Sequence, residues 1–321
     1  MSTQTSGPPP AAEAVPEPVG ARGGGSPVRG AVKAVRRWWF DPVPGSRLAW
    51  VRALVYLFVP YDILVITQDV KGTAALPAEF YQPTMVARWL HLPTPTTGIA
   101  DTLQWVLLIA APLAATGRFH RSLGLVVAGA FTWWQLINMG YGKVDHDHFA
   151  IVIAVWVLPT AGKARFRDDT PSEAAAWTLR CMQVAAISTY SLAAWAKIRE
   201  AGWGWASGAT FYWAIERRGT PFGKWFLDHP ELLRFGQWVI FLAELCAPVI
   251  LFLRRWWLAA GLVFWLGFHL ATWLSIGIHF LPTIICLTAF VPWEKVGTRL
   301  SGLRGSRRRE DAQAAVLAPG R

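Results

Sequence analysis

Long apolar runs, separated by short polar or basic segments, form the main pattern of this chain between residues 47 and 293. A helix needs roughly 20 apolar residues to cross a hydrocarbon core about 30 Å thick. Eight runs come near that length: residues 47–67, 99–117, 121–141, 147–162, 172–197, 235–253, 256–277 and 278–293. The pattern predicts an all-α fold, a polytopic transmembrane helix bundle of about eight spans, of which the fourth and eighth are the shortest.

The segments outside these runs have a different composition. Residues 1–46 are rich in Pro, Gly, Ala and Ser and show no apolar periodicity, so a disordered tail is expected there. No apolar core with a small-residue cleavage site follows the basic residues of this tail, so no signal peptide is predicted. The predicted organisation is a disordered cytoplasmic tail (1–46), a transmembrane domain (47–293) and a basic cytoplasmic tail (294–321).

The overall composition supports a membrane class. Hydrophobic residues make up 53% of the chain and charged residues only 16%, which is too apolar for a soluble domain of 321 residues. The 20 Trp residues fit the enrichment of Trp at bilayer interfaces. Cys181, Cys246 and Cys286 lie singly in apolar runs without metal-type spacing, which is typical of small core residues.

The net charge of +11 comes from Lys and Arg at the two ends of the chain and in every second connection between the apolar runs. This alternation is the positive-inside pattern, and it predicts a multi-pass protein of the cell membrane with both termini cytoplasmic and no nucleic-acid partner. The connection between the fifth and sixth runs departs from the pattern, because it is basic although its predicted side is outside. The basic positions assigned to the inside are Arg29, Lys33, Arg36, Arg37, Arg118, Arg121, Lys163, Arg165, Arg167, Arg254, Arg255 and Arg304 to Arg309.

Several titratable side chains are expected to meet on the outer side. In the predicted topology, Lys197 ends the fifth span, His148 begins the fourth, and His279 lies between the seventh and eighth, with His269 deeper in the seventh. Polar groups at such depths are costly in lipid and usually have a function. The sequence therefore predicts a polar pocket that faces the extracytoplasmic side.

Short motifs in the same regions resemble a known family. They are Asp147-His148-Phe149, Gln183 with the run 190–198 that ends in Lys197-Ile, Trp205-Ala-Ser-Gly208, Phe241-Leu-Ala-Glu244, and Phe268-His269 with Ile276-Gly-Ile-His279-Phe280. In this order, over roughly residues 45–293, they resemble the membrane part of vitamin K-dependent gamma-carboxylases. Proteins with that part alone form the horizontally transferred transmembrane (HTTM) family.

The resemblance implies site roles. It carries the catalytic lysine and histidine of the carboxylases over to Lys197 and His148, and it makes a lipid-soluble quinone the expected cofactor. This chain has Lys197-Ile-Arg199 where the carboxylases have a Lys-Lys pair, and Asp147 where they have an Asn. No large domain follows residue 293 in this sequence, so carboxylation of protein glutamates is not implied. His269, His279, Gln183 and Tyr190 are the expected cofactor contacts.

Each of these residues has a simpler alternative. Lys197 is either a base with a lowered pKa in an apolar site or a helix-end lysine that extends to the headgroups. The run 145–148 (Asp-His-Asp-His) is a divalent-metal site, a hydrogen-bonded loop cap, or a place where His148 transfers protons or touches substrate. His269 needs a polar partner in mid-span whether or not it has a chemical role. No metal is part of the prediction.

Two carboxylates also fall in apolar runs. Asp62 and Glu244 are expected to face the bundle interior. Glu244 is interpreted either as the partner of a buried cation or hydroxyl, or as a proton relay.

Three classes of function remain open at this point. The first is a membrane enzyme that handles a quinone or another small lipid-soluble substrate. The second is a non-catalytic factor for maturation or export of a secreted peptide, and the third is a carrier, for which inverted repeats would be the mark and none is found. The sequence lacks the usual nucleotide-binding, zinc-protease and hydrolase motifs.

Overall fold

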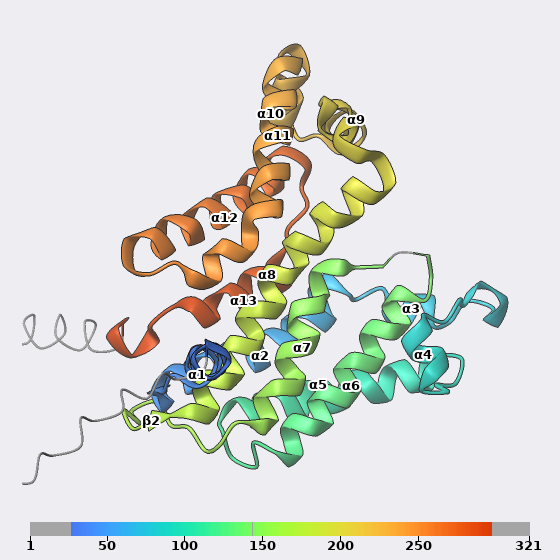
Figure 1. The fold of residues 1–321 in the computed structure, drawn as a ribbon. Helices are drawn as coiled ribbons and strands as arrows, with labels where there is room; N and C mark the ends of the chain where they lie inside the picture. Colours follow the sequence, from blue (N-terminus) through green and yellow to red (C-terminus); the bar gives the residue numbers. More distant parts are fainter. Residues whose placement is uncertain (1–26, 143, 297–321) are drawn as a thin grey trace, which may run out of the picture. The chain divides into compact units, whose positions relative to one another are not determined.

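The computed structural model describes residues 27–142 and 144–296 and is almost entirely helical. The α-helices are α1 (Pro27–Phe40), α2 (Gly45–Tyr61), α3 (Val70–Thr73), α4 (Met85–Trp89), α5 (Thr97–Ala115), α6 (Ser122–Met139), α7 (Phe149–Val157), α8 (Glu173–Ala201), α9 (Ala209–Arg218), α10 (Pro221–Lys224), α11 (Pro230–Cys246), α12 (Arg255–Ile276) and α13 (Leu281–Leu287) (Figure 1). Short 3₁₀ segments are η2 (Ala78–Phe80), η3 (His146–His148), η4 (Leu158–Thr160), η5 (Gly202–Ser207), η6 (Trp225–Asp228), η7 (Ala247–Phe252) and η8 (Thr288–Phe290), and η1 (Asp62–Ile66) is a π-helix. The all-α prediction is confirmed.

Helix α1 belongs to a separate compact unit that ends at Trp38. It falls within residues 1–46, for which the composition predicted a disordered tail. Residues 1–26 lie outside the described part of the chain, and so does the tail from 297 onward, but residues 27–40 form a helix. The helix was not predicted because its apolar residues, which recur with the 3.6-residue period of a helix, directly follow Pro- and Gly-rich sequence.

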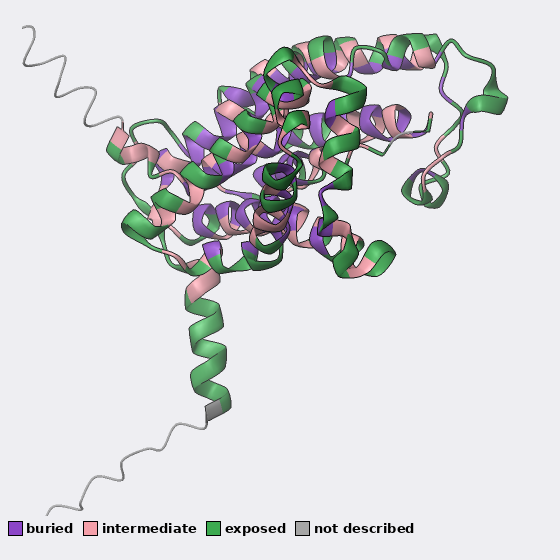
Figure 2. Ribbon diagram, turned by 90° about the horizontal axis from the view of Figure 1, so that it is seen from above, coloured by how far each residue is buried: buried purple, intermediate pink, exposed green. Residues whose placement is uncertain are grey.

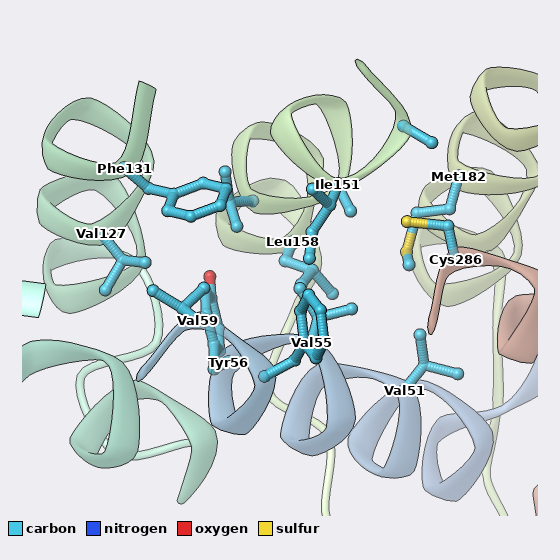
Figure 3. Packing of buried hydrophobic residues seen from close by; sticks show 14 of the residues in the cluster. Val51, Val55, Tyr56, Val59, Val127, Phe131, Ile151, Leu158, Met182 and Cys286 are labelled. Atoms are coloured by element: carbon cyan, nitrogen blue, oxygen red, sulfur yellow. The ribbon is translucent and has the colours of Figure 1, made fainter. Parts of the chain in front are cut away.

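Helices α2, α5, α6 and α7 form the best-packed part of the second unit. Alanines on α5 and Gly124 on α6 permit close approach, since a Cβ built on Gly124 would lie 2.7 Å from the Tyr56 hydroxyl. Figure 3 shows the side chains that fill the space between the helices. They include Val51, Val55, Tyr56 and Val59 of α2, Val127 and Phe131 of α6, Ile151 of α7, Met182 of α8 and Cys286 of α13.

Helix α8 is the longest helix and contacts α7 and α13 as well as α11 and η7 (Figure 1). Its first turn is capped by Ser172, whose hydroxyl accepts from the Ala175 N–H at 3.2 Å. The two-residue strands β1 (Val43–Pro44) and β2 (Pro171–Ser172) pair antiparallel and join the start of α2 to the start of α8. The chain therefore fixes both helices at a common end.

The connections between helices gather at two ends. At one end, Gly45 N–H donates to Thr170 O at 3.1 Å and the Arg47 guanidinium pairs with Glu294 at 2.5 Å. The basic connections that the sequence assigned to the inside thus include neighbours in space.

At the opposite end, the remaining connections meet. Gln82 N–H donates to Gly140 O at 2.8 Å, and the Thr283 hydroxyl donates to Asp147 O at 3.1 Å. Gln82 and Asp147 belong to connections that the sequence assigned to the outside, and Gly140 and Thr283 lie at the adjoining ends of the third and eighth predicted runs.

Four helices are long and apolar enough to cross a membrane: Gly45–Ile66, Thr97–Ala115, Pro230–Phe252 and Arg255–Ile276. This is fewer than the eight predicted spans. The other four predicted runs are also helical, but the polar residues of α6 and α8 lower their mean hydropathy, and the segments His146–Thr160 and Leu281–Phe290 are short. The four long apolar helices are compatible with a membrane protein.

Two of these four helices bury little of their surface. Only 11% of the most apolar stretch of Arg255–Ile276 is buried, and 28% for Pro230–Phe252. Large apolar side chains on them are exposed, such as Phe235, Val263 and Trp273 at 68%, 68% and 51%. Figure 2 shows exposed and buried positions following one another along many helices. A contiguous apolar surface of this kind is unfavourable in water and favourable against lipid or a partner.

Candidate functional site

Asp62 lies where helix α2 changes its winding. After Pro60, which has no N–H to donate, the chain passes into the π-helix η1, and Thr67 N–H donates to Asp62 O at 2.8 Å. A π-turn shifts the side chains that follow it and is frequent at functional sites. The Asp62 side chain is completely buried, which confirms that it faces the bundle interior.

Three side chains donate hydrogen bonds to the Asp62 carboxylate. His148 Nε2 lies 2.8 Å from Oδ1, while Gln135 Nε2 and Thr67 Oγ1 lie 2.8 and 3.3 Å from Oδ2. Trp134 Nε1 in turn donates to Thr67 Oγ1 at 2.8 Å. A buried carboxylate must have such partners, because its desolvation cost is large. We name Asp62, Thr67, Gln135, Asp147 and His148 the Asp62 cluster.

His148 lies between two carboxylates. Its Nδ1 is 3.2 Å from Asp147 Oδ1, and its Nε2 faces Asp62, so both ring nitrogens are aimed at acceptor-only groups. Ionised carboxylates at both nitrogens favour the imidazolium form of the ring, in which both nitrogens donate. Of the alternatives for residues 145–148, this geometry corresponds to the hydrogen-bonded loop cap. In residues 27–142 and 144–296 no group of three or more His, Cys, Asp or Glu is placed to hold a metal ion.

Lys197 is paired with Glu244. The Lys197 Nζ donates to Glu244 Oε2 and lies 4.3 Å from the centre of the Trp205 ring. The two side chains are 20% and 7% exposed, so the pair is largely removed from solvent. This confirms the interpretation of Glu244 as the partner of a buried cation. Gln237, which is fully buried, donates to Trp205 O and holds the segment that carries the ring.

A large cavity connects the two charged groups. Its volume is about 1430 Å³, and residues of α4, α6, α7, α8, α9, α11 and α12, of η3, η5 and η6, and of the connections before η3 and after α12 line it. Most of the wall is apolar, but His148, Lys197 and Glu244 all reach it. The predicted convergence of Lys197 and His148 is therefore observed as a shared cavity wall, whereas their predicted catalytic roles remain predictions.

Tyr190 and His269 lie behind this wall. The Tyr190 hydroxyl is 2.7 Å from His269 Nε2, and the Tyr190 ring stacks on Trp265 with centroids 3.7 Å apart. Both side chains are buried and neither lines the cavity. They link α8 to α12 by their contact with each other, and their expected role as cofactor contacts stays a prediction.

Gln183 and His279 are also absent from the cavity wall. Gln183 is 14 residues before Lys197, which is about 21 Å along a helix, and its amide donates to Ala289 O at 2.9 Å. Gln183 and Tyr190 are seven residues apart on α8 and share a face of that helix, but Gln183 lies far from Lys197 because the axial separation is too large. His279 follows α12, and its Nδ1 is buried without a hydrogen-bond partner in the described structure.

Two amides that were not predicted as site residues hold the site together. Gln135 in α6 binds Asp62, and Gln237 in α11 binds the Trp205 backbone; both side chains are at most 2% exposed. Each is a polar amide inside an apolar run, which is the same kind of signal that singled out Asp62 and Glu244.

Comparison with known proteins gave no relative. No protein-family model matches the chain, and neither a curated protein nor a solved structure matches it. The candidate site therefore rests on its own geometry: a largely apolar cavity whose wall includes His148 and Gln135 of the Asp62 cluster and the Lys197–Glu244 pair.

Proposed function

We propose that this chain is a multi-pass membrane protein of the HTTM type that binds a lipid-soluble small molecule of the quinone class in this cavity. Lys197 and His148 are its proton-transfer groups, as in a gamma-carboxylase-like or quinone-linked enzyme. The observation that carries the proposal is a largely apolar cavity in whose wall His148 and the Lys197–Glu244 pair lie together.

The size and lining of the cavity suit an amphiphilic ligand. Sites for drug-sized molecules are typically about 300–1,000 Å³ and mostly apolar with a few placed polar groups. The volume of about 1430 Å³ leaves room for a ring with a long apolar tail. The tail would contact the apolar side chains, while a ring oxygen would meet Lys197 or His148.

The charged groups supply the chemistry of proton transfer. A largely desolvated ammonium held by Glu244 and the Trp205 ring can give a proton to a ring oxygen and take it back. Asp62 and Asp147 hydrogen-bond to the two nitrogens of the His148 ring and fix its orientation, so a proton leaves or enters His148 through one of these two contacts. Glu244 and Asp62 position these donors and stabilise their charges.

The membrane topology belongs to the same proposal. Eight helical segments cross or enter the bilayer, both termini are cytoplasmic, and the Asp62 cluster is at the extracytoplasmic end. The two groups of connections described above support this arrangement, because residues assigned to the same side are hydrogen-bonded neighbours. The short segments His146–Thr160 and Leu281–Phe290 contact other helices and need not span the core alone.

A second candidate is a non-catalytic factor for maturation or export of a secreted peptide. It is favoured by the exposed aromatic side chains that follow α8. Trp203, Trp213, Phe222 and Trp225 are 53–70% exposed. Exposed aromatics of this kind are common anchors for peptides.

Mass spectrometry of small molecules extracted from the detergent-purified protein tests the proposal. We expect the wild type to retain a quinone and Lys197→Met to lose it. Arg199→Met is the matched control, since it removes a positive charge two residues away whose side chain is 69% exposed and does not line the cavity. An empty wild type would contradict quinone binding, and a co-purified secreted peptide would favour the second candidate.

Cysteine labelling in intact cells tests the topology. In a background with Cys181, Cys246 and Cys286 replaced by Ala, a membrane-impermeant maleimide should label His146→Cys and leave Arg165→Cys unlabelled. The reverse pattern would show that the orientation is inverted.

A further inference from the structure

Helix α1 has an apolar face that is exposed. At 100° per residue, Val28, Val32 and Val35 fall within an arc of about 60°. Their side chains are 68%, 63% and 57% exposed. Three branched apolar side chains aligned on one side of a 14-residue helix form a continuous apolar stripe.

The side of α1 next to the valine stripe is basic. Arg29, Lys33, Arg36 and Arg37 occupy a separate arc of about 100°, and all four are exposed. The segment Pro27–Phe40 contains no Asp or Glu, so nothing within the helix neutralises these charges. An isolated helix of this length is marginal in water, and an interface that takes up both faces would stabilise it.

We propose that α1 binds the surface of an anionic lipid bilayer, with the valine stripe at the boundary between headgroups and acyl chains and the four basic side chains on lipid phosphates. A helix with an apolar face and a Lys- and Arg-rich face is the type that lies in this interface. The charge selects the partner, because each basic residue near an anionic leaflet adds to the attraction whereas a zwitterionic surface offers none.

The covalent connection is compatible with this location. Residues 41–44 separate α1 from the first long apolar helix, Gly45–Ile66. Four extended residues span at most about 14 Å. A helix tethered so closely to a membrane-spanning helix stays within reach of the headgroups, and its binding would fix which leaflet holds the start of Gly45–Ile66.

The test uses the full chain in vesicles. In the cysteine-free background, an environment-sensitive fluorophore is attached at Val32→Cys on the apolar stripe or at Gly30→Cys on the far side, where an added side chain meets no atom within 4 Å. In phosphatidylcholine vesicles containing phosphatidylglycerol, we expect the label at 32 to be blue-shifted and shielded from an aqueous quencher, and the label at 30 to be quenched. In pure phosphatidylcholine both labels should be quenched.

The charges are tested separately. Arg36→Gln with Arg37→Gln removes two basic contacts at about 1 kcal/mol each, which lowers the docking equilibrium roughly 30-fold. Shielding at 32 that is equal in both vesicle types, or that survives this double substitution and high salt unchanged, would overturn anionic lipid as the partner. Equal quenching at 30 and 32 in anionic vesicles would overturn membrane binding by α1 altogether.

Discussion

Removing the Asp62 carboxylate should destabilise the fold strongly. Asp62→Ala leaves His148 Nε2 and Gln135 Nε2 without their acceptor in side chains at most 2% exposed. Breaking a buried ion pair by deleting one partner costs about 3–5 kcal/mol. Asp62→Asn keeps an oxygen for Gln135 and lets a neutral His148 accept from the new amide, so its cost should be nearer to about 1–3 kcal/mol.

An exposed ion pair supplies the matched control. Lys71 Nζ lies 2.6 Å from Asp101 Oδ1, but these side chains are 46% and 48% exposed. Asp101→Ala should therefore cost at most about 1 kcal/mol. Unfolding in mixed micelles with rising SDS, followed by Trp fluorescence, measures the free energy of unfolding for the wild type and the three variants.

The double substitution makes the test stricter. Because Asp62 and His148 are bonded to each other, Asp62→Ala with His148→Ala should cost less than the sum of the two single substitutions. Additive costs, or an Asp62→Ala variant as stable as Asp101→Ala, would refute the argument that the Asp62 cluster holds the ends of α2, α6 and α7 together.

Three further predictions concern packing, pH and an interhelical hydrogen bond. Gly124→Ala should lower stability because the new Cβ would lie 2.7 Å from Pro159 Cγ, whereas Gly129→Ala, with no atom within 4 Å, should be neutral or raise stability by up to about 1 kcal/mol in thermal unfolding. Burial alone would raise the pKa of Glu294, but its hydrogen bonds with Arg47 outweigh this and hold the pKa below the ordinary value. The pair therefore stabilises the fold above the ordinary carboxyl pKa and loses this effect as pH falls through the lowered one, so Glu294→Gln should remove that part of the acid sensitivity of the unfolding midpoint. Tyr190→Phe should cost about 1–3 kcal/mol by leaving both nitrogens of buried His269 without a partner, and a variant with wild-type stability in the same assay would contradict this role.

Much of the fold follows from the apolar pattern alone. Each of the eight predicted runs is occupied by helix, because a long apolar run with few charges has little alternative to helix. The number of helices able to span a membrane was overestimated, since the pattern does not separate a segment such as His146–Thr160 that is packed among other helices from one that faces lipid. Helix α1 was not predicted, because the disordered-tail prediction for residues 1–46 used their composition and not the helical spacing of Val28, Val32 and Val35.

The sequence identified individual residues of the candidate site but did not predict which of them pair with each other. Asp62, Glu244, Lys197 and His148 stand out in the sequence as costly groups, yet the pairing of Asp62 with His148 depends on the π-turn after Pro60. No spacing rule foretells that turn. Lys197 and Glu244 are brought together by the packing of α11 on α8. This contact depends on tertiary structure, so the sequence pattern did not predict it either.

The way in which α12 is attached has a mechanical consequence. Tyr190 binds it at His269, and Thr220 N–H binds it at Ser275 O at 3.0 Å, so these hydrogen bonds hold its second half. Phe264 and Phe268 of the same helix line the cavity. Because these hydrogen bonds lie in its second half, a small tilt of α12 about His269 would displace its beginning most, and the cavity would widen or narrow with that tilt.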